Sequence, residues 1–309
     1  MTQVALVVHP VKVADPPALI ENVRKRCAHL GWPEPIVVET SVEDPGAGVT
    51  RQALKDGATL VIAAGGDGTV RAVAEAVVLE GRAGTPAVLG IVPEGTGNLL
   101  VRNLDLPAGL DEALDVAFNG RDRTIDVGQV DSGEIFAVMA GIGLDAAMVR
   151  DAPEALKKRV GWLAYLFGAA RGLRNERLKV QIVVDDAAPL VRSARAVLVG
   201  NVGRLQGGVD LLPESAPASG ELEIAVLAAR GPIEWMAVLT GAALGRHPAR
   251  RDRRLERLSG RRIAVRARSP QPREVDGDLL PERADLSVEV LPGALTVRVP
   301  ADDHTKEED

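Results

Sequence analysis

Three nearly continuous apolar runs in the first third of the chain constrain its fold more than any other feature. The runs are Val4–Val8, Thr59–Ala64 and Val88–Val92. Strands that are apolar on both faces are buried on both faces, and helices between them cover a parallel sheet. The segment after the second run fits this, because its apolar residues recur at i, i+3, i+4 and i+7. We expect helices at 18–30, 50–55, 70–79 and 99–103 and a further strand at 36–39, which together make an α/β domain.

The pattern changes after about Arg121, where short segments rich in β-branched residues replace the alternation of strand and helix. Glycine, proline and aspartate separate these segments, which is typical of an antiparallel sandwich or barrel. Helical stretches at 155–174 and 233–244 interrupt the series. We expect strands at 124–130, 135–139, 178–184, 195–199, 222–227, 263–267, 286–291 and 295–299.

The composition excludes several classes of protein. With 46% hydrophobic and 26% charged residues, the chain is too apolar to be disordered over most of its 309 residues. Its one cysteine, Cys27, excludes a disulfide scaffold. Aromatic residues make up only 2%, so we expect no nucleic-acid partner. We also expect a cytoplasmic location, because no apolar stretch approaches the roughly 20 residues of a membrane span and residues 1–8 lack a basic leader.

A strongly basic segment lies within this acidic chain, whose net charge is −6. Between Arg246 and Arg273 there are 11 arginines and two acidic residues. Such a block indicates an anionic partner or, equally well, a solvated arginine face. The stretch at 155–174 places Trp162, Tyr165 and Phe167 behind a basic triplet. We expect both segments to contact an anionic membrane surface, and the alternative for the aromatic residues is packing into the core.

A glycine loop, Gly65-Gly66-Asp67-Gly68-Thr69, follows the second apolar run and opens the next helix. Glycines let backbone N–H groups approach a ligand closely, and a helix N-terminus attracts anions. Thr69 is the expected N-cap of the helix. Asp67 would repel a phosphate unless a divalent cation lies between them or the carboxylate accepts a proton. The loop therefore predicts phosphate together with Mg²⁺, or phosphate together with a hydroxyl group that is to be deprotonated.

A second loop, Pro93-Glu94-Gly95-Thr96-Gly97-Asn98, follows the third apolar run. Ligands of parallel sheets bind beyond the carboxyl ends of the strands, so we expect both loops at one crevice. Each loop alone is compatible with an ordinary βα turn, but two in adjacent units favour a binding site. Neither loop has the pattern of a Walker A motif or of a dinucleotide-binding Rossmann fold.

These two loops resemble the signatures of the soluble bacterial lipid kinases with a diacylglycerol kinase catalytic domain, relatives of sphingosine kinases and NAD kinases. Further similar segments lie at 126–128, 140–145, 200–208 and 275–278, and the resemblance extends from about Val4 to Val299. It implies an α/β fold with an N-terminal parallel-sheet nucleotide-binding domain and a C-terminal antiparallel β-sandwich domain, with the active site in the cleft between them. The first domain would comprise residues 1–121 and part of 292–309, and the lipid-substrate domain residues 122–291.

The resemblance also implies an ATP- and Mg²⁺-dependent kinase that phosphorylates a hydroxyl group of a diacylglycerol-like membrane lipid, giving a product like phosphatidic acid. Asp67 would be catalytic and would hold Mg²⁺ together with Asp126, while Asp278 would orient or deprotonate the hydroxyl group. As structural alternatives, Asp126 is a surface acid, Asp278 a turn residue and Asn98 a helix cap. The residues expected to contact the nucleotide are Lys12, Gly65, Gly66, Gly68, Thr69, Glu94, Gly95, Thr96, Gly97 and Asn98.

Three positions depart from the pattern of this family. His9-Pro10 stands where the family usually has Asn-Pro, and Asp276-Gly277-Asp278 stands where it has Asp-Gly-Glu, whose glutamate is the proposed general base. Ser219-Gly220 replaces an Asp-Gly pair that helps to hold a structural metal, so we do not expect that metal site. A kinase of a soluble alcohol such as NAD and a catalytically inactive nucleotide-binding regulator are the alternative functions. A homodimer is compatible with the sequence, which does not encode the oligomeric state or the acceptor lipid.

Overall fold

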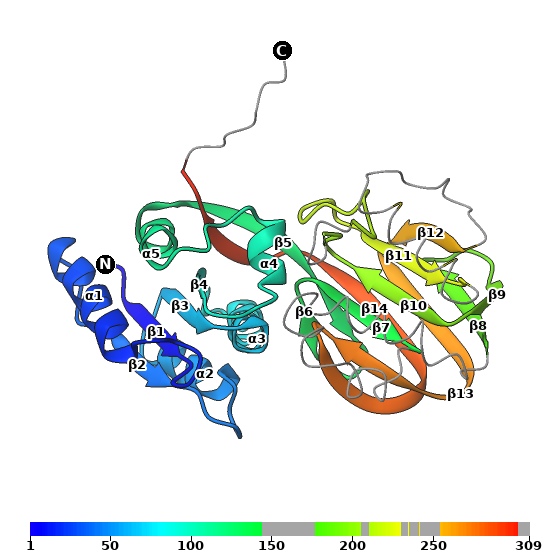
Figure 1. Ribbon diagram of the computed structural model, residues 1–309, viewed down its shortest axis with the longest axis horizontal. Helices are drawn as coiled ribbons and strands as arrows, with labels where there is room; N and C mark the ends of the chain where they lie inside the picture. Colours follow the sequence, from blue (N-terminus) through cyan, green and yellow to red (C-terminus); the bar gives the residue numbers. More distant parts are fainter. Residues whose placement is uncertain (144–176, 205–209, 230–233, 235–240, 242–253, 302–309) are drawn as a thin grey trace, which may run out of the picture. The chain divides into compact units, whose positions relative to one another are not determined.

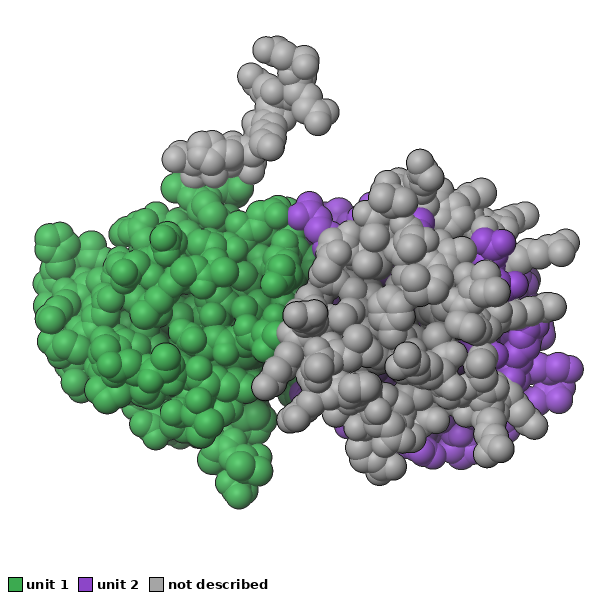
Figure 2. Space-filling model, in the orientation of Figure 1, with its two compact units in different colours: residues 1–125, 294–309 green, residues 126–293 purple. Residues whose placement is uncertain are grey.

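The computed structural model describes residues 1–143, 177–204, 210–229, 234, 241 and 254–301. The chain divides into two compact units, residues 1–125 with 294–309 (unit 1) and residues 126–293 (unit 2; Figure 2). The boundary expected at residue 121 falls at the start of β5 (Arg121–Val130), and this strand continues through the division at residue 125. The helical stretch 155–174 with its aromatic residues and basic triplet, most of 233–244, and the arginines at 246–253 lie outside the described residues.

Unit 1 is built on a parallel sheet with the strand order β14-β4-β3-β1-β2 (Figure 1). The last part of β14 (Asp278–Val299) joins this sheet through the pairs Thr296–Val88 and Val297–Leu89. The other strands are β1 Val4–Val8, β2 Ile36–Glu39, β3 Leu60–Gly65 and β4 Val88–Pro93. The helices are α1 Pro16–His29, α2 Ala47–Lys55, α3 Asp67–Arg82, α4 Leu99–Asn103 and α5 Leu110–Asn119.

The helices cover both faces of this sheet, as the apolar runs predict. Alternate residues of β1 and β3, such as Leu6 and Ile62, pack in one cluster with buried side chains of α1 and α5, and Cys27 belongs to this cluster. The other face of β1 lies beside α2 and α3, where Val7 and Val73 both approach the start of α2. The carboxyl ends of β3 and β4 are adjacent, because Gly65 pairs with Pro93. This pairing brings the two glycine loops together.

Unit 2 is antiparallel, with the strand order β12-β11-β10-β7-β13-β14 and with β8, β9, β5 and β6 attached beside this path. β13 pairs with β8 near its start and with β7 near its end, so one strand takes part in two layers. The strands are β6 Ile135–Phe136, β7 Met139–Ile142, β8 Leu178–Val184, β9 Leu190–Ala194, β10 Ala196–Gly200, β11 Leu222–Leu227, β12 Leu255–Gly260 and β13 Arg262–Val275.

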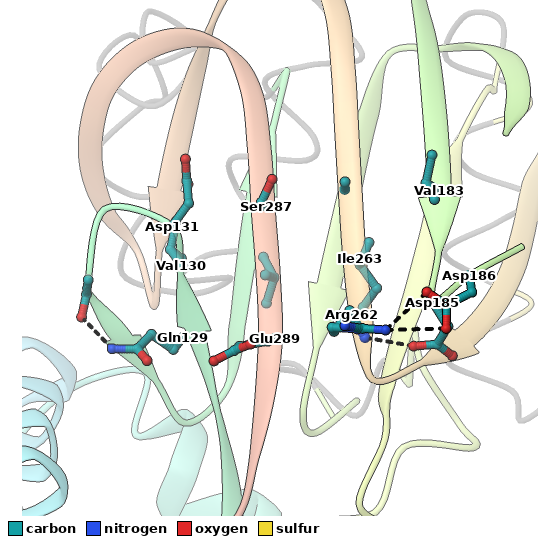
Figure 3. A pocket seen from close by; sticks show the side chains of 13 residues that line it. Gln129, Val130, Asp131, Val183, Asp185, Asp186, Arg262, Ile263, Ser287 and Glu289 are labelled. Carbon is teal, nitrogen blue, oxygen red and sulfur yellow. Dashed lines mark hydrogen bonds and ion pairs between the residues drawn. The ribbon is translucent and has the colours of Figure 1, made fainter.

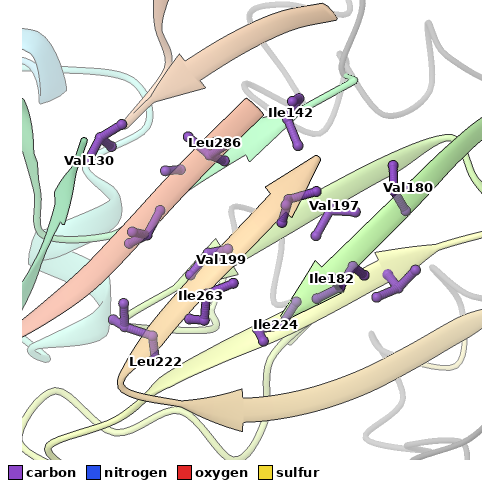
Figure 4. Close-up of a cluster of buried hydrophobic side chains, with 14 of the residues drawn as sticks. Val130, Ile142, Val180, Ile182, Val197, Val199, Leu222, Ile224, Ile263 and Leu286 are labelled. Atoms are coloured by element: carbon purple, nitrogen blue, oxygen red, sulfur yellow. The ribbon is translucent and has the colours of Figure 1, made fainter. Parts of the chain in front are cut away.

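A hydrophobic cluster lies between the strands of unit 2 (Figure 4). Every second residue contributes to it, as in a sheet with one solvated face. Examples are Val180 and Ile182 of β8, Val197 and Val199 of β10, and Ile263 and Val265 of β13. No helix within the described residues has the length and apolar character needed to span a bilayer.

The structure corrects several local expectations. α3 begins at Asp67 with Gly66 as its N-cap, so the prediction that Thr69 caps the helix is wrong, and Thr69 is buried in the first turn. The expected strands 286–291 and 295–299 form one strand, β14. The basic block contains β12 and most of β13, and two of its arginines, Arg257 and Arg273, are only 4% and 2% exposed. These two side chains are therefore structural and not part of a solvated face.

Candidate functional site

The first glycine loop places unpaired backbone donors at the end of the sheet in unit 1. Val70 donates the first helical hydrogen bond of α3 to the Gly66 carbonyl, so the N–H groups of residues 67–69 have no partner within the helix. A Cβ atom on Gly68 would meet no heavy atom within 4 Å. The N-terminus of α3 therefore combines backbone donors, the positive end of the helix dipole and open space, which is the environment that an anion needs.

Asp67 joins this loop to the second one. Its Oδ2 accepts the N–H of Asn98 at 2.9 Å, and its Oδ1 accepts the N–H of Leu99 at 2.7 Å. The carboxylate thus binds the first N–H groups of α4, a role usually taken by a residue next to the helix in sequence. The N–H of Glu94 also donates to the carbonyl of Gly65 at 2.8 Å. The two loops form one connected structure.

The second loop closes on itself through Asn98, which has a left-handed backbone with φ of 48°. The Asn98 side chain accepts the Gly95 N–H at 3.1 Å and donates to the Gly95 carbonyl at 2.9 Å. Asn98 is the N-cap residue of α4, as expected, but its side chain braces the loop and does not bond an N–H group of the helix. Glu94 is half-buried, and burial raises the pKa of its carboxyl.

The glycines of the site fall into two groups, those packed against neighbouring atoms and one that lies beside open space. A Cβ on Gly95 would lie 2.8 Å from the Cα of Gly66, and one on Gly97 would lie 2.6 Å from Oδ2 of Asp67. These three glycines allow the loops to touch. Gly65 lies against Thr69, because a Cβ there would be 2.8 Å from the Thr69 side chain. At Gly68, by contrast, no described neighbouring atom excludes a side chain. Packing therefore does not account for a glycine at this position, and we interpret the open space as room for a ligand.

Lys12 and His9 complete the cluster in unit 1. The Lys12 Nζ would be 2.8 Å from a Cβ on Gly66, so this ammonium group lies beside the first loop. His9 Nδ1 accepts the N–H groups of Val11 and Lys12, both at 3.3 Å. An asparagine side chain forms the same kind of turn by accepting N–H groups that follow it. His9 therefore makes, through Nδ1, the turn that the family's usual asparagine would make.

Asp126 has a structural role that the sequence did not reveal. It is 3% exposed, its Oδ2 accepts the Gly220 N–H at 2.6 Å, and its Oδ1 accepts the Gly293 N–H at 2.8 Å. The carboxylate thus holds two loops of unit 2. Each Asp67 oxygen accepts one backbone N–H and the side chain is only partly buried, so Asp67 fits a metal-bound water better than the enclosed Asp126 does. In the described part of the chain, no group of three or more His, Cys, Asp or Glu side chains is arranged for a metal ion.

The Asp276-Gly277 pair forms the two-residue turn between β13 and β14, since Val275 pairs with Asp278. Both residues have positive φ, 48° and 90°, as a type I′ turn requires. The Asp276 carboxylate accepts three successive N–H groups, those of Ala137, Val138 and Met139, at 2.8–3.0 Å. Asp278 follows the turn and is exposed. The turn is therefore fixed by Asp276, and Asp278 is the first residue of β14 after it.

Glu274 lies beside this turn and was missed by the sequence reasoning. It is 5% exposed, and its Oε2 accepts the Gly277 N–H at 2.9 Å. Its Oε1 is buried with no hydrogen-bond partner in the described structure. Burial raises the pKa of Glu274 to about 8, and the charges of Asp276 and Asp278 act in the same direction. In the sequence, Glu274 is an acidic residue two positions before the turn. Such a residue is usually exposed on the surface of a strand, so its burial could not be predicted.

Comparison with known proteins gives matches over nearly the whole chain. A family model described as "Diacylglycerol kinase catalytic domain" matches residues 4–130, and one described as "YegS C-terminal NAD kinase beta sandwich-like domain" matches residues 137–299. A "Probable lipid kinase YegS-like" of Pseudomonas syringae pv. syringae (strain B728a) is 31% identical, covering 92% of this chain and 91% of that protein. A "Diacylglycerol kinase" of Bacillus subtilis (strain 168) is 29% identical over 71% of each chain.

Among solved structures, a putative diacylglycerol kinase from Bacillus anthracis str. Sterne superposes with a TM-score of 0.77 at 20% identity, covering 96% of each chain. The expected fold class, a parallel-sheet α/β domain followed by an antiparallel β-sandwich domain, is confirmed.

Proposed function

Because the chain belongs to the YegS-like lipid kinases with a diacylglycerol kinase catalytic domain, we propose that it transfers the γ-phosphate of ATP to a hydroxyl group of a diacylglycerol-like lipid. This family is the one expected from the two glycine loops. The observation that carries the proposal is the open space beside Gly68, where backbone donors at the start of α3 lie next to Lys12. The product would be a phosphatidic-acid-like lipid.

The residues of unit 1 fit the phosphates of a nucleotide. The N–H groups of residues 67–69 would donate to phosphate oxygens, and Lys12 would neutralise part of their charge. Asp67 would hold Mg²⁺ through its remaining lone pairs, and the assignment of Asp126 to the metal stays a prediction. Mg²⁺, when bound, neutralises charge that develops on the phosphates. Asp278 would accept the proton of the lipid hydroxyl group or orient that group.

The change at His9 does not support the alternative of an inactive regulator, because the imidazole makes the turn that an asparagine would make. At position 278 the aspartate side chain is one methylene shorter than the glutamate of the family pattern. A kinase of NAD is the second candidate, because the family model that matches residues 137–299 describes a β-sandwich like that of NAD kinases. The acceptor therefore has to be determined by experiment.

We expect the purified chain, given radiolabelled ATP, Mg²⁺ and a total lipid extract, to label a lipid product and not to label NAD. Asp67→Ala should abolish the labelling while the protein stays folded, as judged by circular dichroism. Asp44→Ala is the matched control, because the Asp44 carboxylate also accepts backbone N–H groups at the start of a helix, those of Gly46, Gly48 and Val49. Wild-type labelling by the Asp67 variant would contradict the proposed site, and labelling of NAD alone would select the second candidate.

We also propose that the protein associates peripherally with an anionic membrane surface, from which it would take its substrate. Arg266 and Arg268 support this, because they alternate with buried residues and lie exposed on one face of β13. Sedimentation with vesicles tests the proposal, and equal binding to neutral and anionic vesicles would contradict it.

A further inference from the structure

A basic hollow in unit 2 has no role in the phosphate transfer proposed above, and Arg268 of the exposed face of β13 is one of its lining residues. Its volume is about 580 Å³, within the usual range for small-ligand sites. The lining comes from the end of β7, the start of β8, the junction of β9 and β10, the middle of β13 and the neighbouring β14. Four basic side chains line it, Arg177, Lys179, Arg195 and Arg268, against one acidic side chain, Glu282.

An irregularity in β13 creates the hollow. The register between β13 and β14 shifts between Arg266 and Gln271 and again between Gln271 and Arg273. Pro270 and Pro272 lie in this stretch and cannot donate to a neighbouring strand, which is why such residues occur at bulges. The Pro272 carbonyl accepts the N–H of Gly143 at 2.9 Å, so the bulge is anchored to the end of β7. The hollow is thus a fixed feature of the backbone.

The basic side chains converge on this hollow from different strands. Arg177 and Arg195 donate to the carbonyls of Ala228 and Ala229, at 3.3 and 3.1 Å, so adjacent carbonyls hold both guanidinium groups. Ala267 of β13 pairs with Val180 of β8 in the antiparallel register. Arg268 and Lys179 are the next residues on these two strands, so they lie at facing positions. Both are exposed, and no ion pair joins either to a carboxylate among the described residues. Like charges at paired positions are unfavourable unless an anion lies between them.

A second hollow in unit 2 provides a contrast (Figure 3). It has a volume of about 640 Å³ and several acidic side chains, and the arginine in its lining is already held by a carboxylate. Arg262 pairs with Asp186 at 3.1 Å, Asp185 accepts the N–H groups of Arg261 and Arg262, and Gln129 donates to the Gly133 carbonyl. The arginine of that hollow is thus paired within it, whereas Lys179 and Arg268 of the basic hollow have no ion pair to a carboxylate of the described residues and favour an external anion.

We propose that the basic hollow is a phosphate-binding site, built from unit 2 residues alone, and that its ligand is the phosphate of a phosphorylated lipid headgroup. Arginine and lysine are the side chains that bind phosphate most strongly, and their arrangement on several strands suits a tetrahedral anion. The volume exceeds that of a phosphate ion and leaves room for the glycerol part of a headgroup beside Leu178 and Pro270.

The test measures binding without ATP, so that its failure leaves the kinase proposal untouched. The full chain is sedimented with phosphatidylcholine vesicles that contain or lack phosphatidate, and it is titrated separately with glycerol 3-phosphate. Lys179→Glu and Arg268→Glu should weaken binding to phosphatidate vesicles by about tenfold or more. Arg262→Glu, the same change of charge on the same face of β13, should change it by less than about twofold.

The outcomes separate the sources of the phosphate. Binding of phosphatidate vesicles alone supports a lipid headgroup, and binding of glycerol 3-phosphate that the same two variants weaken supports the phosphate site with a soluble ligand. Equal losses in all three variants would mean general electrostatic attraction and would overturn the proposal. Unchanged binding in the Lys179 and Arg268 variants would also overturn it, including the case in which another part of the chain covers the hollow.

Discussion

Glu274 makes the stability of unit 2 depend on pH. In an unfolded chain its carboxyl has the ordinary pKa of 4.5, and in the folded protein burial raises the pKa to about 8. Below pH 4.5 the carboxyl is neutral in both states, so its full contribution to stability is present. Between these values only the unfolded chain ionises, which lowers the free energy of unfolding by about 1.4 kcal/mol per pH unit at most. The contribution is lost once the pH has risen through the folded pKa.

Replacing Glu274 by glutamine should remove this dependence. The amide oxygen of Glu274→Gln can still accept the Gly277 N–H, and the side chain carries no charge at any pH. Urea unfolding at a series of pH values from 5 to 8 should show the variant gaining stability over the wild type as the pH rises. Glu289→Gln, an exposed change on β14, is the control. Parallel pH profiles for wild type and Glu274→Gln would show that the buried carboxyl is not the cause.

Asp276 and Asp278 are two residues apart but should respond differently to substitution. Asp276→Ala removes the acceptor of three N–H groups in unit 2, so we expect a loss of several kcal/mol in the free energy of unfolding. Asp278→Asn changes an exposed side chain and should leave stability within about 0.5 kcal/mol. If Asp278 acts as the base, that variant should slow lipid phosphorylation by about 10²–10⁴-fold, and Asp278→Glu should retain activity. Wild-type rates for Asp278→Asn would remove this residue from the mechanism.

At the scale of the element, the start of α3 allows binding to be tested apart from folding. Gly68 lies in the first turn of α3 outside the left-handed region, and a Cβ there meets no heavy atom within 4 Å. Gly68→Ala should keep or raise the unfolding temperature, since alanine favours a helix over glycine by up to about 1 kcal/mol. The new methyl group would occupy the proposed phosphate position, so nucleotide affinity should fall. Undiminished affinity would place the phosphates elsewhere.

Gly95→Ala is the matched comparison for this prediction. Its Cβ would lie 2.7 Å from Asn98 Oδ1 and 2.8 Å from the Cα of Gly66, so the two loops would have to separate. We expect this variant to lose both stability and nucleotide affinity, in contrast to Gly68→Ala. The comparison separates glycines that are required by the fold from the one that is required by the ligand.

The elements of unit 1 could be predicted because their signals are local. A run such as Val4–Val8 shows its burial in five adjacent residues, and the helix after β3 shows its period within three turns. β12 could not be predicted from the sequence, because Arg257 occupies a buried position where an alternating strand pattern would have an apolar residue. That arginine is buried because it faces Glu223 of β11, at 4.0 Å. A pairing between residues 34 positions apart leaves no pattern in the sequence near either residue.

The chemistry of the candidate site was predictable in part for the same reason. The residue types and the spacing of both glycine loops indicated a phosphate site. The contact of Asp67 with residues 98 and 99 depends on the pairing of β3 with β4, which places the ends of two strands side by side. The partners of Asp126 are more distant still, 94 and 167 residues along the chain, so its burial was not foreseeable.

At the scale of the whole molecule, each unit has a hydrophobic cluster of its own among the described residues. The unit 1 cluster is formed by β1, β3, α1 and α5 with Val92 of β4, and the unit 2 cluster is formed only by residues between 130 and 290. Two strands, β5 and β14, have residues in both units. A ligand of one unit can therefore stabilise the core of that unit alone. Because β5 and β14 run through both units, stabilising one core can also stabilise the other.

Hydrogen exchange in the presence of an ATP analogue should distinguish these possibilities. A ligand present at 100 times its dissociation constant stabilises the unit that binds it by about 2.7 kcal/mol. If the nucleotide binds at the glycine loops, amides of β3 and β4 should exchange more slowly, and amides of β10 and β11 should change little. Gly68→Ala should abolish the protection, which ties it to the proposed position. Equal protection of all four strands would mean that the two cores unfold as one cooperative unit joined through β5 and β14.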